Sequence, residues 1–154
     1  MKRPFLALAR DERGTSLIEF GFLVPFLALL TMGVIDLSRG LAERFAIQQA
    51  VSRGLELVQS RPALAAATAS DVDYSFVKTE VGRAAGIKPA EVDQHVTVTR
   101  WLECNGVDAG DVNGTCPTNQ DTARYLKVRV TKAFVGEFYL KTVPMAASGT
   151  LRTQ

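Results

Sequence analysis

A single carboxylate, Glu19, lies near the start of an apolar run that extends from Leu17 to Ile35. An unpaired carboxylate costs about 2.5–3.5 kcal/mol near the centre of a bilayer and less near an interface. Gly14 precedes Glu19 by five positions and follows a basic leader. If the chain is cut after Gly14, Thr15 gains a free α-amine. The carboxylate of Glu19 can then pair with the α-amine of a neighbouring subunit, which fixes the stagger between their helices.

A simpler interpretation makes Glu19 an interfacial carboxylate near the cytoplasmic headgroups. An acid in the first turn of a helix gains about 0.3–1 kcal/mol from the helix dipole, so it needs no partner there. The two interpretations differ at Gly14, because a cut after this residue matters only to the first.

The remaining reactive side chains do not form a recognisable catalytic pattern. His95 is the one histidine, and a Ser or Cys nucleophile would need a histidine beside it that an acid orients. Cys104 and Cys116 are too far apart for CxxC redox or zinc chemistry, but a disulfide between them fits an oxidising compartment. We therefore predict no enzyme activity, no catalytic or metal-binding residue and no cofactor.

The apolar run is long enough to cross a membrane. Its 19 residues would form a helix about 28 Å long, close to the ~30 Å hydrocarbon thickness. A secretory signal is shorter and ends at a small-x-small site, which "GVIDLSRG" does not offer. The basic leader keeps the N-terminus cytoplasmic. We expect a single-pass protein of the bacterial inner membrane with a periplasmic C-terminal part.

The helix is expected to continue beyond the membrane to about residue 60. Apolar side chains recur mostly at steps of three and four, at Leu37, Leu41, Phe45, Ile47, Val51, Leu55 and Val58. Pro25 should kink the helix within the membrane. The chain thus divides into a leader (1–14), a long helix (15–60), an alanine-rich linker (61–70) and a head (71–154).

The head is predicted to combine a second helix with an antiparallel sheet. Asp71 or Asp73 can cap the helix, and Gly86 is expected to end it. Alternating apolar residues predict strands over 95–103 and 124–136, with further short strands over 138–143 and 149–152. The fold class is therefore α+β, a long N-terminal helix carrying a head with three or four strands. Without a basic block or a basic patch interleaved with aromatic residues, nucleic acid is not an expected partner.

The residues "RGTSLIEF" resemble the prepilin-like signal of type IV pilins and pseudopilins. The longer stretch "GTSLIEFGFLVPFLALLTMGVIDLSRG" is similar to TadE-like proteins, the minor pseudopilins of tight-adherence (Tad, or Flp) pili. The matching positions are Gly14, Glu19 with Phe20, Pro25, and Gly33 with Asp36. The resemblance is specific over about residues 10–40.

This resemblance implies a pilin-like architecture and a set of partners. A prepilin peptidase would cut between Gly14 and Thr15, and Glu19, Phe20 and Pro25 would serve assembly. The other partners would be Tad pilins and pseudopilins, the inner-membrane assembly platform and the membrane itself. A head larger than that of the major Flp pilin favours a minor or assembly role, at the pilus base or in the extracellular pilus, in support of surface adhesion. The alternative is an uncleaved, membrane-anchored periplasmic module that binds another envelope component.

Overall fold

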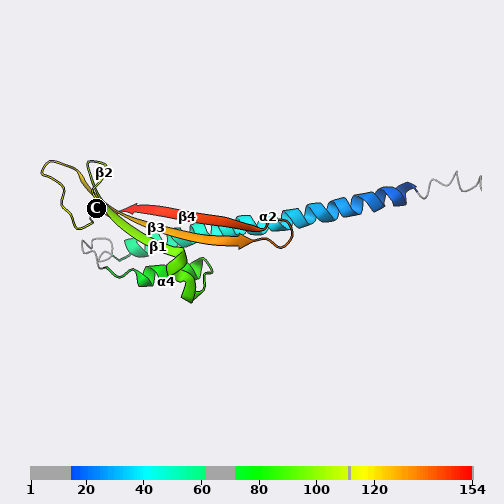
Figure 1. Cartoon of the computed structure of the whole chain (residues 1–154), viewed down its shortest axis with the longest axis horizontal. Coiled ribbons are helices and arrows are strands. Elements are labelled where there is room, and N and C mark those ends of the chain that lie inside the picture. The colour runs from blue at the N-terminus through cyan, green and yellow to red at the C-terminus, as the bar shows by residue number, and fades with distance from the viewer. Residues whose placement is uncertain (1–14, 62–71, 111, 154) are drawn as a thin grey trace, which may run out of the picture.

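One long helix and a head packed on its C-terminal half make up the protein (Figure 1). The computed structural model describes residues 15–61, 72–110 and 112–153. Helix α2 (Thr15–Gln59) begins at the first described residue and continues through Pro25 without interruption. The predicted leader and all but the first residue of the predicted linker lie outside the described residues. The long helix and the antiparallel sheet confirm the predicted α+β fold.

The described residues after α2 form three further helical segments and four strands. After α2 the chain forms α4 (Ser75–Ala84), a 3-10 turn η2 (Pro89–Glu91) and the short helix α5 (Val92–His95). The antiparallel sheet has the order β2-β1-β3-β4, with bounds Val96–Cys104 for β1, Val107–Asp108 for β2, Thr122–Val135 for β3 and Thr142–Arg152 for β4. The sheet covers one side of α2, while α4 packs against both α2 and β1.

Two predicted strand boundaries were wrong. The segments 138–143 and 149–152 are not separate strands, because one strand, β4, runs from Thr142 to Arg152 after a turn. Small residues obscured it in the sequence, since Ala147 and Gly149 occupy positions that face α2. His95 ends the short helix α5 instead of starting a strand, and the first residue of β1 is Val96.

The start of α4 differs from the predicted cap, because its N-cap residue is Tyr74, which makes no side-chain capping bond. The carboxylate of Asp73 accepts the backbone N–H of Ser75 at 2.7 Å, whereas Asp71 lies outside the described residues. Val77 and Val81 are fully buried. Phe76 is exposed instead, with the guanidinium of Arg61 4.2 Å from its ring centroid.

A disulfide and a pair of stacked aromatic rings stabilise the end of the sheet opposite the β3–β4 turn. Cys104 and Cys116 are joined, as predicted. Asn105 and Gly106 both have positive φ, at 55° and 81°, which is the geometry of the tight turn between β1 and β2. Trp101 and Tyr125 are cross-strand partners whose rings stack with centroids 5.4 Å apart.

The core lies between α2, α4 and one face of the sheet. Leu126, Val128 and Val130 of β3 are completely buried, as their alternation predicted. The core contribution of α2 comes only from its C-terminal part, at Ile47, Ala50, Val51 and Val58.

The buried stripe of α2 differs from the apolar stripe expected near the membrane. Leu37, Leu41 and Phe45 were expected to form its first half, but all three are exposed. The residues that face the head there are Asp36 and Gly40, both buried, followed by the half-buried Glu43. These positions keep the helical steps of four and three that lead into Ile47. The stripe is therefore continuous, although its membrane-proximal half is polar or small.

Gly54 is required by the close approach of α2 to α4. A Cβ atom at this position would lie 2.5 Å from Cγ2 of Val81, a side chain with little rotamer freedom. We expect Gly54→Ala to lower the free energy of unfolding by about 1–3 kcal/mol through overpacking.

The matched control is Gly40→Ala on the same helix. The nearest atom to its added Cβ is 3.5 Å away, in the ring of Phe134, which is an ordinary contact. This variant should be neutral or gain up to about 1 kcal/mol from helix propensity. Denaturant unfolding of the full chain in detergent, followed by near-UV circular dichroism, compares the two. Equal stability of both variants would contradict the packing described for Gly54.

Candidate assembly helix and its junction with the head

The N-terminal part of α2 extends beyond the head as a bare helix (Figure 1). Among the described residues, α2 is the one helix long and apolar enough to cross a membrane, and its most apolar 18-residue window has a mean hydropathy of 2.1. None of its spanning window is buried inside the protein. Such a surface is stable in lipid and costly in water. The helix fits the expected single membrane pass.

The predicted assembly residues all lie on this bare helix. Glu19 and Phe20 are exposed, and Pro25 is inside α2. Thr15 is the first residue of the helix, while Gly14 and therefore the predicted cleavage site lie outside the described residues. Seventeen residues separate Glu19 from Asp36, about 25 Å along a helix. The fold does not bring the predicted assembly residues to the head.

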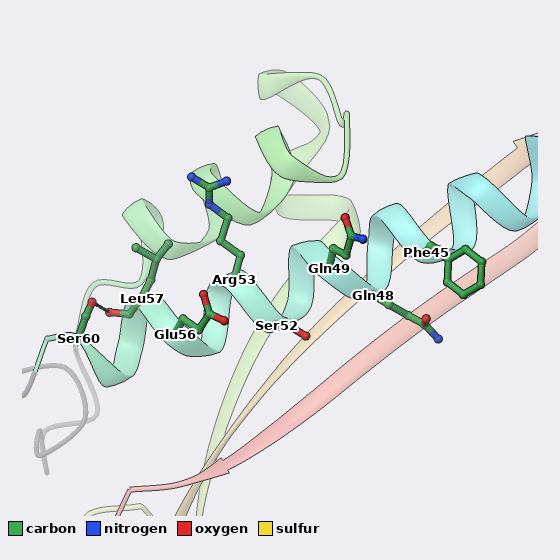
Figure 2. A pocket seen from close by; sticks show the side chains of 8 residues that line it. All are labelled: Phe45, Gln48, Gln49, Ser52, Arg53, Glu56, Leu57 and Ser60. Atoms are coloured by element: carbon green, nitrogen blue, oxygen red, sulfur yellow. Dashed lines mark hydrogen bonds between the residues drawn. The ribbon is translucent and has the colours of Figure 1, made fainter.

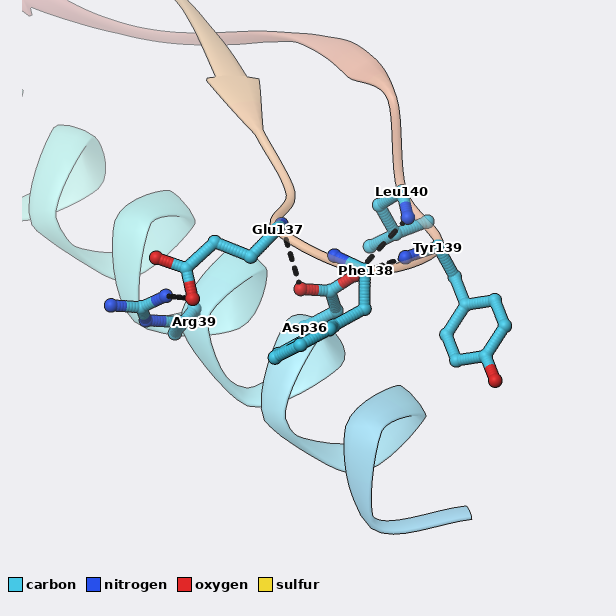
Figure 3. A network of polar contacts seen from close by, with 6 residues as sticks. All are labelled: Asp36, Arg39, Glu137, Phe138, Tyr139 and Leu140. Carbon is cyan, nitrogen blue, oxygen red and sulfur yellow. Dashed lines mark hydrogen bonds and ion pairs between the residues drawn. The ribbon is translucent and has the colours of Figure 1, made fainter. Parts of the chain in front are cut away.

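A carboxylate that follows the span directly, Asp36, binds the head. Its oxygens accept four consecutive backbone N–H groups from the turn between β3 and β4 (Figure 3). Oδ1 accepts from Glu137 at 3.0 Å, and Oδ2 accepts from Phe138, Tyr139 and Leu140 at 3.0, 2.7 and 3.1 Å. The side chain is buried, with 1 % of its surface exposed.

These amides lower the pKa of Asp36 from 3.8 to about 2. The hydrogen bond from Tyr139 contributes most, burial of the carboxylate opposes it, and the other three N–H groups add to the lowering. Hydrogen bonds to the charged form of an acid favour that form. Asp36 therefore stays ionised at any physiological pH.

Three further contacts fix the β3–β4 hairpin along the same stripe of α2. Arg39 forms an ion pair with Glu137 of the turn. One helical turn later, the ring of Phe134 packs beside Gly40, 3.5 Å from the place a Cβ atom would occupy. Glu43 pairs with Lys132, whose Nζ also donates to the backbone oxygen of Ala85 at 2.9 Å. Polar and steric contacts thus hold this half of the hairpin, whereas apolar packing holds the other half.

Sequence reasoning did not find this junction. From the sequence, Asp36 was recognised only as the residue that ends the apolar run and as the acid that follows Gly33. One signal was present in the sequence. Asp36 directly follows the apolar run, and the pattern of an apolar helix face does not account for an acid at this position. Its partners are backbone amides about a hundred residues later, and the separation of 101 residues to Glu137 leaves no local pattern.

Comparison with known proteins finds a family to which the N-terminal segment is similar. Residues 14–55 match the family described as TadE-like protein, which confirms the resemblance found in the sequence. The match covers the bare helix, Asp36 and most of the helix that carries the head. No curated protein matches the chain, and no solved structure does.

Removing the Asp36 carboxylate should release the β3–β4 turn from α2. In Asp36→Ala, four backbone N–H groups lose a charged acceptor, and the loss of hydrogen bonds to a charged group is destabilising. We expect a melting temperature several degrees lower and fast hydrogen exchange at residues 137–140, measured by mass spectrometry on the full chain in detergent.

The matched control is Asp93→Ala, which removes an exposed acid paired with Lys78. Exposed ion pairs contribute little to stability, so this variant should keep the parent melting temperature. Unchanged exchange at residues 137–140 in Asp36→Ala would contradict the role given to the carboxylate.

The junction should also respond to acid in a defined range. Because the pKa of Asp36 is lower in the folded protein, its stabilising effect is complete above the ordinary value of 3.8 and is lost as the pH falls toward 2. Amide NMR shifts of residues 137–140 in the full chain should stay constant from pH 7 to pH 4 and move between pH 4 and pH 2. A transition near pH 5 or above would show that the four amides do not hold the carboxylate in its charged form.

Proposed function

We propose that this chain, whose residues 14–55 form a TadE-like segment, is a minor pseudopilin or assembly component of a tight-adherence type IV pilus. The proposal is carried by one observation: the family match coincides with a helix whose apolar surface the head leaves bare. Its role is structural and non-enzymatic. It supports pilus biogenesis and, through the pilus, surface adhesion.

The exposed face of α2 beyond the span supports assembly through helix packing. Leu37, Leu41 and Phe45 lie at steps of four on this face, and each exposes about half of its side chain. Apolar positions at this spacing form one stripe, which another helix can cover. Large exposed apolar patches mark interaction sites in proteins.

A groove continues this face toward the end of the helix (Figure 2). Its volume is about 680 Å³. It is lined by Phe45, Gln48, Gln49, Ser52, Arg53, Glu56, Leu57 and Ser60. Amide, hydroxyl and charged groups line most of it, so the helix changes from an apolar to a polar surface along its length. A neighbouring subunit would pack first on the apolar part and make hydrogen bonds farther from the membrane.

Glu19 supplies the second part of the assembly mechanism. It lies on the bare helix, where an unpaired carboxylate is costly. Cleavage by a prepilin peptidase after Gly14 would place an α-amine on Thr15, one helical turn from Glu19. Pairing between Glu19 and the Thr15 amine of a neighbour would remove most of the cost and set the axial register. Phe20 and Pro25, farther along the bare helix, would shape the same contact.

The head would lie in the periplasm and act close to the membrane. The Cys104–Cys116 disulfide is of a kind that persists in oxidising compartments. The other Tad pilins and the inner-membrane assembly platform are the partners that this location implies.

Substitutions at Gly14 and Glu19 test the proposal in the native cells. Gly14→Leu should prevent cleavage and abolish pili, because a bulky residue replaces the glycine before the cut. Glu19→Ala should be cut normally but should reduce pilus number at least tenfold, because a neighbour's amine loses its partner. Immunoblots give the processing state, and electron microscopy gives the number of pili.

The control is Asp93→Ala, which removes an exposed acid of the head that lies outside the proposed assembly surface. It should leave cleavage and pilus number unchanged. If Gly14→Leu and Glu19→Ala behave like this control, the chain is an uncleaved, membrane-anchored module instead.

A further inference from the structure

We propose that the turn between β3 and β4 is a membrane-contacting element. The side chains of Phe138, Tyr139 and Leu140 would enter the interfacial layer of the leaflet where α2 leaves the bilayer. This inference rests on α2 spanning the membrane and does not depend on the pilus role.

The position of the turn along α2 follows from the Asp36 hydrogen bonds. Asp36 is the first residue after the span ends at Ile35, and its carboxylate holds the N–H groups of residues 137–140. A span of 19 residues is about as long as the hydrocarbon core is thick. The turn is therefore fixed at the depth of the headgroups and cannot move away without breaking four hydrogen bonds.

The side chains of the turn suit that depth. The side chains of Phe138, Tyr139 and Leu140 are 50, 53 and 37 % exposed, although their backbone amides are bound by Asp36. In Figure 3 the ring of Tyr139 extends from the turn toward the more N-terminal turns of α2, which is the side of the span. Tyrosine is enriched at membrane interfaces because its ring is apolar and its hydroxyl polar.

The charges around the turn also favour a phospholipid surface. Both acids at the turn have partners within the protein: the four amides bind the ionised carboxylate of Asp36, and Arg39 pairs with Glu137. Lys141 directly follows the turn and is exposed. Long basic side chains at the end of a span reach toward lipid phosphates. The partner is therefore the lipid of the same bilayer that α2 crosses.

Fluorescence quenching by brominated lipids tests this contact. The chain has one tryptophan, Trp101, so a Trp101→Phe background is free of other indole signals. Two probes are placed in the turn separately, Tyr139→Trp and Phe138→Trp; both leave the backbone bonds to Asp36 in place. The control probe is Val107→Trp in β2, an exposed apolar position at the disulfide end of the sheet. Each full-length variant is placed in nanodiscs of lipid brominated near the headgroup, and circular dichroism checks its fold.

We expect bromine to remove most of the emission of both turn probes and to leave the Val107 probe unchanged. Unbrominated discs should give a blue-shifted maximum for the turn probes, since their indoles leave water. Quenching of the turn probes no greater than that of the control would overturn the proposal. A blue shift that increases with the number of chains per disc, without quenching by bromine, would also overturn the proposal. A second copy of the chain, and not lipid, would then cover the turn.

Discussion

The bond between one carboxylate and four consecutive backbone amides fixes how the head sits on its helix. Asp36 follows the membrane span directly, and its partners lie at the tip of a hairpin formed by the two longest strands. Hydrogen bonds to a charged acceptor are stronger and more directional than those between neutral groups. Both the height and the rotation of the sheet around α2 therefore depend on this contact.

Two kinds of packing meet along α2 as a consequence. Far from the membrane, Ile47, Val51 and Val58 pack into an apolar core with the sheet and α4. Near the membrane, Asp36, Arg39 and Glu43 hold the hairpin through charged contacts. If both faces of α2 were apolar in this part, their chemistry would not distinguish the face that binds the head from the face proposed to bind a neighbour. The polar half of the junction leaves Leu37, Leu41 and Phe45 exposed on the other side, where the proposed contact with a neighbour would form.

Features that repeat locally could be predicted from the sequence. The helical period identified α2, and the alternation of Leu126, Val128 and Val130 identified the buried face of β3. The spacing of Cys104 and Cys116 suggested the disulfide that is present. The predicted cleavage and assembly residues have a different basis, since Gly14 and Glu19 are noticeable only beside a basic leader and an apolar run.

Features that depend on distant contacts could not be predicted. Backbone amides are common to every residue except proline, so nothing in "GEFYL" marks it as the partner of Asp36. Gly149 weakened the apolar pattern of β4 because glycine has no side chain. The same absence of a side chain lets Leu55 and Val51 of α2 pack closely against the strand. The stripe beginning at Asp36 and Gly40 was missed because periodicity was sought only among apolar residues.

The most direct test of the assembly account is the intact mass of the protein purified from the membranes of its native cells. The account requires a mature chain that begins at Thr15, with the α-amine available to pair with Glu19 of a neighbour. A mass that matches the chain from Thr15 to Gln154, apart from any modification of the new N-terminus, is the predicted result. A chain that retains Gly14 and the basic leader would contradict it.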